Sequence, residues 1–271
     1  MRRTGLRATG IVTAIAAGLA LAAGPSRSAE TDVDLALVLA VDISRSMDFD
    51  EQQLQRDGYV AALTHPEVIQ AIAEGGFGRI AVTYVEWAGN YHQVTIVPWT
   101  VIAGAADAEA FAARIASAPI VRETGTSISG GLEFAAARLA ESGVRAVRRT
   151  IDVSGDGPNN MGGPVVPVRD RLVADGITIN GLPILLKTSG YVSPFSIPNL
   201  DVYYEDCVIG GPGAFMITVD DMRGFAVAVR RKLGLEIAGL PARVIPAAAV
   251  SAAPRIDCMI GEKLRQRWMD P

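Results

Sequence analysis

The chain has few of the side chains that most often perform catalysis or bind transition metals. Its 271 residues include two cysteines and two histidines. Cys207 and Cys258 lie far apart, so no C-x-x-C metal or redox motif is present. A Gly-x-Ser-x-Gly nucleophile elbow is missing, and the glycine-rich stretch at 210–213 lacks the Lys-Ser/Thr of a phosphate-binding loop. These absences argue against a cysteine-based metal site, a serine hydrolase of that type and a P-loop nucleotide site.

Long apolar runs are also missing after the N-terminus. There, an uncharged Ala/Leu/Ile-rich stretch at 10–23 follows three arginines and precedes a group of small residues. This pattern predicts a secretory signal peptide over 1–29, cleaved after Ser28 or Ala29, and a periplasmic or secreted protein. A membrane anchor is the alternative, although the stretch is shorter than the roughly 20 residues of a spanning helix. The paired arginines at the start also allow twin-arginine export.

Basic residues are too few for a nucleic-acid-binding surface. The formal net charge is −4, and loss of residues 1–28 removes four arginines and no acidic residue, which leaves 21 basic against 29 acidic residues and a net charge of −8. A nucleic-acid partner would call for a basic stripe. The remaining length suits one domain, which we place at 30–240, followed by an Ala/Pro-rich linker and C-terminal tail over 241–271.

The most informative stretch begins with seven consecutive apolar residues at 35–41. A run this short and apolar on both faces predicts the central strand of a parallel sheet with helices on either side. Asp42, Ser44 and Ser46 follow it as D-x-S-x-S, at the carboxyl end of the strand, where open α/β sheets bind their ligands. Carboxylate and hydroxyl oxygens suit Mg²⁺, Ca²⁺ or Mn²⁺. Capping of the next helix is the alternative role for these three residues.

Two later motifs complete a pattern with the first. The chain carries Gly125-Thr126 and then Ser154-Gly155-Asp156-Gly157. In this order the motifs resemble those of the von Willebrand factor A (vWA) domains, a family that includes the integrin I domains and has a metal-ion-dependent adhesion site. The family pattern places a Gly four residues and an aliphatic residue six residues after its Thr, which favours Thr126 over Thr124. The family commonly has Thr before its Asp, where this chain has Gly155 and therefore lacks one hydroxyl near the metal.

The resemblance, which spans about 32–239, implies a fold, a site and a type of partner. The fold is a doubly wound α/β structure with a mostly parallel sheet and helices on both faces. The metal residues are Asp42, Ser44, Ser46, Thr126 and Asp156. The resemblance implies that Ser44, Ser46 and sometimes Thr126 bind Mg²⁺, or Mn²⁺ or Ca²⁺, directly and that the two aspartates act mostly through water. The ion would then accept an Asp or Glu of a partner protein. Within the family, the chain also resembles a group of exported bacterial proteins of uncharacterised function.

Catalysis is the alternative function for the same site. The cation would act as a Lewis acid, or Ser44 or Ser46 would act as a nucleophile. Neither His65 nor His92 lies in a motif that would supply a general base, and both are expected at the surface. We therefore expect a binding module rather than an enzyme.

The remaining patterns predict further elements of the fold. A hairpin is expected at Gly89-Asn90, and Pro98 favours an edge position for its second strand. The stretch 200–209 is interpreted as part of a long connection, and the basic run at 230–232 as a structural feature near a helix C-terminus. Helices are expected at 48–64, from Pro66 onward, and at 105–118, 132–142, 167–175 and 222–237; other strands are expected at 79–87, 94–101, 149–153, 177–185 and 215–219.

The two cysteines are expected to pair. Export implies an oxidising compartment, and with only two cysteines the pairing is unambiguous. Two separate buried thiols are the alternative. A Cys207–Cys258 bond would tie the C-terminal tail to the connection before the last strand.

Overall fold

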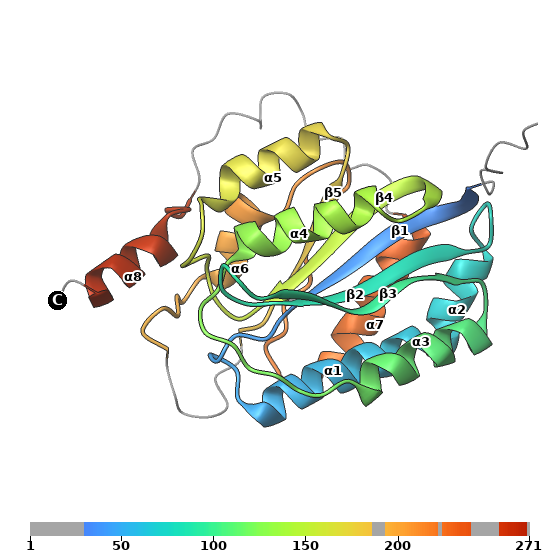
Figure 1. Ribbon diagram of the computed structural model, residues 1–271, viewed down its shortest axis with the longest axis horizontal. Helices are drawn as coiled ribbons and strands as arrows, with labels where there is room; N and C mark the ends of the chain where they lie inside the picture. Colours follow the sequence, from blue (N-terminus) through green and yellow to red (C-terminus); the bar gives the residue numbers. More distant parts are fainter. Residues whose placement is uncertain (1–29, 186–192, 222–223, 240–254, 270–271) are drawn as a thin grey trace, which may run out of the picture.

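The computed structural model describes residues 30–185, 193–221, 224–239 and 255–269, so the predicted signal peptide and most of the Ala/Pro-rich linker lie outside the described residues. Helices cover both faces of a five-stranded sheet (Figure 1). The strands are β1 (Thr31–Asp42), β2 (Ile80–Trp87), β3 (Gln93–Ile102), β4 (Val144–Gly155) and β5 (Thr178–Pro183). The helices are α1 (Phe49–Leu63), α2 (Pro66–Ala73), α3 (Ala105–Ser117), α4 (Ile128–Ala140), α5 (Val165–Ala174), α6 (Leu200–Tyr203), the π-helical turn η1 (Tyr204–Val208), α7 (Phe225–Ala238) and α8 (Ile260–Met269).

The sheet has the order β3-β2-β1-β4-β5. β1 pairs in parallel with β2 and β4, β5 pairs in parallel with β4, and only β3 is antiparallel, at the edge beside β2. The predicted mostly parallel sheet with one antiparallel edge strand is therefore confirmed. In place of the strand expected at 215–219, the structure has two isolated parallel bridges. Met216 pairs with Gly181 of β5, and Val219 pairs with Ile184, directly after β5.

Alternate residues of β1 face the two helical layers. Leu35, Leu37 and Leu39 belong to a core shared with α1, α3 and α7, whereas Ala36 and Val38 belong to one shared with α4 and α5. Figure 1 shows the same division, with α4 and α5 on one face of the sheet and α1, α2, α3 and α7 on the other. Since a strand alternates its side chains between faces, burial of both sets explains why the run is apolar throughout. The predicted central strand is confirmed.

The interpretation of 200–209 as a connection was wrong. This stretch forms α6 and η1, and Leu200, Tyr203, Tyr204 and Cys207 are buried. These apolar positions recur three or four residues apart, which is the spacing of one helical face. The helix expected to start at 132 also begins earlier, at Ile128.

The basic run at 230–232 is structural, but helix-dipole compensation was the wrong reason. Lys232 lies within α7, is fully buried, and places its Nζ 2.6 Å from Asp152 Oδ1 of β4. The same ammonium contacts Glu236 one turn later in α7, and Asn180 Nδ2 donates to Glu236 Oε1 at 2.9 Å. Two carboxylates thus share one lysine in the core. Lys232 lies on the side of α7 that faces the sheet, so its side chain points away from solvent.

This cluster makes stability depend on pH. Burial, and then the charge of Asp152, raise the pKa of Glu236 to about 7, above the roughly 4.3 of an unfolded chain. The folded state therefore binds more protons between these values, and the contribution of Glu236 to the free energy of unfolding falls as the pH rises through 7. Glu236→Gln keeps an acceptor oxygen without the charge. Relative to wild type, its free energy of unfolding in urea should be higher at pH 8 than at pH 5.

The matched control is Glu109→Gln, at an exposed position of α3. Its free energy of unfolding relative to wild type should be the same at both pH values. If the free energy of unfolding of Glu236→Gln relative to wild type is also the same at both pH values, the pKa of Glu236 is not raised.

Candidate metal-binding site

The D-x-S-x-S loop leaves the carboxyl end of β1 in a defined conformation. Asp42 Oδ1 accepts a hydrogen bond from the backbone N–H of Ser44 at 2.7 Å. From α1, Gln55 Nε2 donates to Asp42 O at 3.1 Å and Gln52 Nε2 donates to Ser44 O at 3.3 Å. Both glutamines are buried. The first helix therefore holds the loop through its backbone and leaves its side-chain oxygens for another role.

Helix capping does not explain the three polar residues. The N-cap of α1 is Asp48, whose Oδ1 accepts from the N–H of Glu51 at 2.8 Å. In return, Glu51 Oε2 accepts from the N–H of Asp48 at 2.8 Å, which completes a capping box. The capping alternative for Asp42, Ser44 and Ser46 is wrong.

The threonine-bearing loop lies directly against this segment. The N–H of Glu123 donates to Ile43 O at 3.0 Å, and the N–H of Arg45 donates to Glu123 O at 2.9 Å. Ser44 and Glu123 form an isolated parallel bridge. Two loops that are far apart in the sequence thus extend the parallel pairing past the end of β1.

Thr126 is in turn tied to the loop that follows Asp156. Its N–H donates to Asn160 Oδ1 at 3.0 Å, and the N–H of Asn160 donates to Thr126 O at 2.8 Å. Gly125 has a φ of +87°, and a Cβ built on it would lie 2.0 Å from Met161 Sδ. Glycine is therefore required before Thr126 for the two loops to approach each other this closely.

Hydroxyl and carboxylate groups from the three loops meet at this edge of the sheet. Ser44 Oγ lies 2.8 Å from Ser46 Oγ, and Ser46 Oγ donates to Asp156 Oδ1 at 2.6 Å. These residues and Thr126 line one cavity of about 250 Å³. With Asp42 beside them, the structure brings all five predicted residues together. Thr124 lines the same cavity, so the preference for Thr126 stays a prediction.

The electrostatics of Asp42 fit a cation site. Its side chain is completely buried, and Oδ2 has no hydrogen-bond partner within the described ranges. Burial, and then the charge of Asp156, raise the pKa of Asp42 well above its ordinary value. Two neighbouring carboxylates, one of them desolvated, are unfavourable without a positive charge. A divalent cation would supply that charge.

The donor set also limits which ion fits. In the part of the chain that the structure describes, no group of three His, Cys, Asp or Glu side chains is placed to hold a metal. Any ion here must therefore rely on serine and threonine hydroxyls together with the two aspartates. Oxygen donors of this kind suit Mg²⁺, Mn²⁺ or Ca²⁺.

Gly155 leaves room for a residue that sequence analysis missed. A Cβ built on Gly155 would lie 2.9 Å from Tyr204 Oη and 3.0 Å from Asp42 Oδ2. The buried Tyr204 hydroxyl, which comes from η1, has no hydrogen-bond partner among the described residues. Tyr204 thus brings a hydroxyl close to the position where the family commonly has Thr. The adjacent tyrosines at 203 and 204 were visible in the sequence, but nothing in it placed them here.

Adding a side chain at this position should therefore destabilise the protein. Gly155→Ala introduces a Cβ into a filled space, and overpacking of this kind typically costs about 1–3 kcal/mol. Gly157→Ala is the control, because a Cβ there meets no atom within 4 Å. We expect a loss of stability in urea unfolding for the first variant only, and partial recovery when Tyr204→Phe is added to it. Equal losses for both glycines would contradict the close approach of Tyr204.

The sequence and the fold both have recognisable relatives. A family described as "Protein of unknown function (DUF1194)" matches residues 32–241. No curated protein sequence matches the chain.

Several solved structures share the fold. One is proximal thread matrix protein 1 from the mussel byssus with a zinc-occupied MIDAS motif, at 16% identity over 77% of this chain and 49% of that one, with a TM-score of 0.56. Others are the pilus adhesin SpaC of Lactobacillus rhamnosus GG (15% identity, 76% and 30% coverage, TM-score 0.54) and the SpRpn10 VWA domain (14%, 78% and 100%, 0.50). This chain spans about half of the mussel protein's length. At these identities the similarity shows the fold alone, and it confirms the predicted vWA fold.

Proposed function

The chain belongs to the family described as "Protein of unknown function (DUF1194)", and from its vWA fold and its site we propose that it is an exported module that binds a partner protein through a divalent cation. The cation is Mg²⁺, with Mn²⁺ or Ca²⁺ as substitutes. One observation carries the proposal: hydroxyls from two loops and a carboxylate from a third converge on one cavity, beside a buried aspartate oxygen that has no hydrogen-bond partner among the described residues. The residues that hold the ion are Asp42, Ser44, Ser46, Thr126 and Asp156.

The make-up of this set suits presentation of the ion to an anionic group. Ser44, Ser46 and Thr126 contribute neutral oxygens, and Asp42 and Asp156 act mostly through water, so the charge of the ion is only partly neutralised. The ion therefore attracts a carboxylate from a partner protein. Without the ion, that carboxylate would approach two aspartates, and like charges at an interface cost several kcal/mol.

The positions of the two histidines favour binding over catalysis. His65 Nδ1 accepts from the N–H of Glu67 at 3.3 Å as the cap of α2, and His92 lies 3.8 Å from Glu123. Neither residue lines the cavity, so neither supplies a general base to a molecule bound there.

Two features support the exported location. The N-terminal sequence has the pattern of a signal peptide, and Cys207 and Cys258 form a disulfide, which persists in oxidising compartments. Among the helices that the structure describes, none combines the length and the apolar character needed to cross a bilayer.

Capture of the partner should depend on the ion. We expect the immobilised mature chain to retain a partner from the exported fraction in Mg²⁺ and to lose it in chelator. Thr126→Ala and Asp156→Ala should also lose it, whereas Thr100→Ala, on the edge strand β3, should not. If the partner is recovered equally with and without the ion, it binds another surface of the protein. Metal-dependent turnover of a substrate would favour an enzyme.

A further inference from the structure

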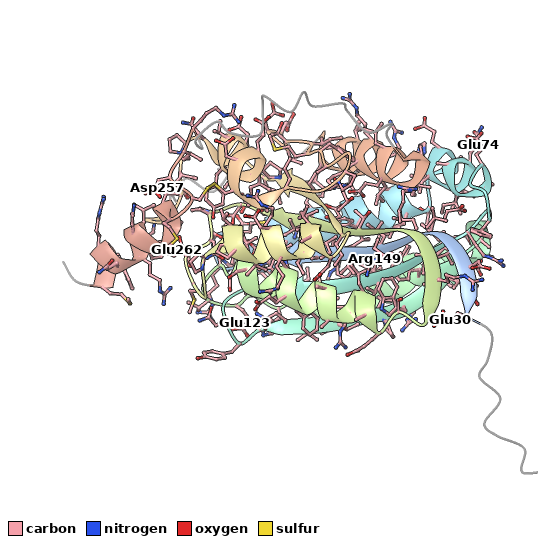
Figure 2. All side chains as sticks on the ribbon, turned by 90° about the horizontal axis from the view of Figure 1, so that it is seen from above. Glu30, Glu74, Glu123, Arg149, Asp257 and Glu262 are labelled. Atoms are coloured by element: carbon pink, nitrogen blue, oxygen red, sulfur yellow. A yellow bond between two sulfur atoms is a disulfide. The ribbon has the colours of Figure 1, made fainter. Side chains whose placement is uncertain are left out.

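The cavity over the proposed metal site has a wall that the family match does not cover. Its lining includes Ser46, Thr126 and Asp156 together with Phe195 and two residues of α8, Arg265 and Trp268. The family match ends at 241, so it does not include α8. Figure 2 shows the C-terminal segment, at Asp257 and Glu262, at the same end of the molecule as Glu123 and opposite Glu30.

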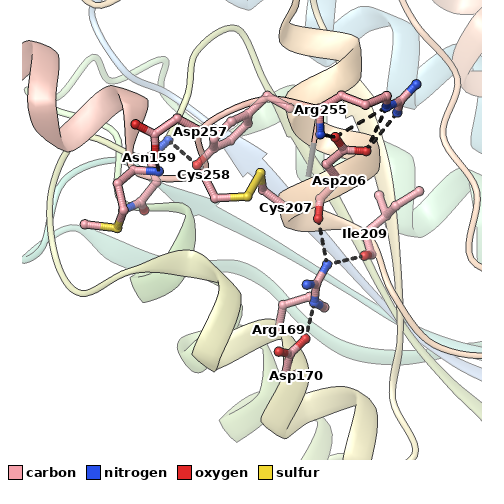
Figure 3. The surroundings of a disulfide bond; sticks show 11 residues. Asn159, Arg169, Asp170, Asp206, Cys207, Ile209, Arg255, Asp257 and Cys258 are labelled. Carbon is pink, nitrogen blue, oxygen red and sulfur yellow. Dashed lines mark hydrogen bonds and ion pairs between the residues drawn. A yellow bond between two sulfur atoms is a disulfide. The ribbon is translucent and has the colours of Figure 1, made fainter. Parts of the chain in front are cut away.

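Covalent and polar contacts hold the start of this segment in place. Cys258 is bonded to Cys207 of η1, and the backbone N–H of Arg255 donates to Asp206 Oδ2 at 2.6 Å (Figure 3). The Arg255 guanidinium also pairs with Glu205 at 2.5 Å and with Asp206 at 2.8 Å. The segment is therefore attached to η1, the element that carries Tyr204.

The first turn of α8 packs directly on the loop after Asp156. Asn159 Nδ2 donates to Glu262 Oε1 at 2.7 Å, and a Cβ built on Gly261 would lie 2.0 Å from Asn159 O. Only glycine permits that approach. Asn159 is buried, and its Oδ1 accepts from the N–H of Ser129 in α4 at 3.1 Å. The position of α8 is thus set by the same loops that form the proposed metal site.

The walls combine positive charge with apolar surface. Arg45 and Arg265 line the cavity, and Asp156 is the one carboxylate among the described residues of its lining, on a chain whose net charge is −4. The rings of Phe195 and Trp268 meet edge to face with centroids 5.9 Å apart, and Trp268 is 63% exposed. The lining therefore complements an anion that carries an apolar group next to it.

The size of the cavity limits what enters. About 250 Å³ is slightly below the roughly 300–1,000 Å³ of sites for small molecules. The space suits one or two side chains of an extended peptide better than a larger ligand.

We propose that this cavity takes an Asp or Glu of an extended peptide segment together with the large apolar residue beside it, and that α8 sets this specificity through Arg265 and Trp268. The inference rests on the proposed function, because the acidic side chain is the one that meets the ion. Arg265 adds a charge-assisted hydrogen bond to the carboxylate. The apolar neighbour packs against Trp268 and Phe195.

The test uses blocked tetrapeptides and the full mature chain. The probes are acetyl-Gly-Asp-Phe-Gly-amide and its Asp-Ser and Asn-Phe counterparts, with free succinate as a small dicarboxylate, all titrated by calorimetry in millimolar Mg²⁺. We expect the Asp-Phe peptide to bind about tenfold more tightly than the Asp-Ser peptide. Trp268→Ala should remove that preference but keep the discrimination of Asp from Asn. Arg265→Ala should lower the affinity for the Asp-Phe peptide about tenfold. Arg267→Ala, also on α8 but outside the cavity lining, should leave that affinity unchanged.

The outcomes separate this inference from the proposed function. If both Asp peptides bind equally well and only in Mg²⁺, the proposed function stands and the role of α8 is overturned. If Asp peptides bind equally in Mg²⁺ and in chelator, or do not bind at millimolar concentration, both are overturned. Succinate that binds as tightly as the Asp-Phe peptide would overturn the peptide as the occupant. Each variant is first shown to keep the wild-type melting temperature in chelator.

Discussion

Asp42→Asn should abolish the Mg²⁺-dependent rise in melting temperature expected of the wild-type protein, and it should also stabilise the metal-free protein. An ion that binds only the folded state adds about 2.7 kcal/mol to the free energy of unfolding at one hundred times its dissociation constant. That increment needs the carboxylate of Asp42. Asp42→Ala and Ser44→Ala should abolish it as well.

The gain in the metal-free state has a separate cause. Asp42 is completely buried beside Asp156, and burial and that charge both disfavour its ionised form. An asparagine keeps the Oδ1 that accepts from the N–H of Ser44 but carries no charge. The gain alone would also fit a buried structural carboxylate, but a purely structural residue would keep the Mg²⁺-dependent shift. The opposite signs with and without the ion therefore distinguish a ligand from a structural carboxylate.

Thermal unfolding in chelator and in millimolar Mg²⁺, Mn²⁺ or Ca²⁺ measures both effects. Asp50→Asn, at an exposed position in the first turn of α1, is the matched control and should keep the full shift. Because protons compete with the ion for the same carboxylates, the shift should shrink as the pH falls. A wild-type protein that does not respond to any of the three ions would contradict the metal site, as would an undiminished shift in Asp42→Asn.

The parts of the fold that the sequence predicted are those set by local patterns. The run at 35–41 is buried on both faces as the central strand, the helix expected at 48–64 is present as α1, and the hairpin after β2 places Pro98 on an edge strand. Each depends on residues a few positions apart. The missed helical turns at 200–208 also carry a local signal, since their apolar residues have helical spacing, but the aromatic pair in them was interpreted as part of a connection.

The residues of the candidate site also fall into those that local motifs predicted and those that only the packing of the fold brings there. Its five predicted oxygen donors stand in short motifs, and the order of strands in a parallel sheet brings those motifs to one edge. Tyr204, Arg265 and Trp268 reach the same edge through η1 and α8, and no spacing in the sequence relates those elements to β1. Lys232 shows the same limit, because its partner Asp152 lies 80 positions earlier on β4. Such contacts depend on how the layers pack and were beyond a sequence-based prediction.

Removing the disulfide should destabilise the protein more than any other substitution considered. Cys207 and Cys258 are bonded across a separation of 51 residues, and closing a loop of that length lowers the entropy of the unfolded chain by an amount equivalent to about 4 kcal/mol. In a domain of this size, 4 kcal/mol corresponds to a fall of roughly 8–16 °C in melting temperature. Arg255 and Glu205 are more than half exposed, whereas Asp206 is 13% exposed. Ion pairs of the exposed Arg255 cannot replace a covalent bond, since exposed pairs contribute at most about 1 kcal/mol.

Cys258→Ser is the variant of choice, because Cys207 is fully buried in η1 while Cys258 is only partly buried. Its melting temperature should equal that of the reduced wild-type protein and should not respond to a reductant. Wild-type protein unfolded without reductant should contain no reactive thiol, and two should appear after reduction. Two free thiols per unreduced molecule would show that the bond does not form. An unchanged melting temperature on reduction would show that Asn159, Glu262 and the packing of Gly261 hold the C-terminal segment without it.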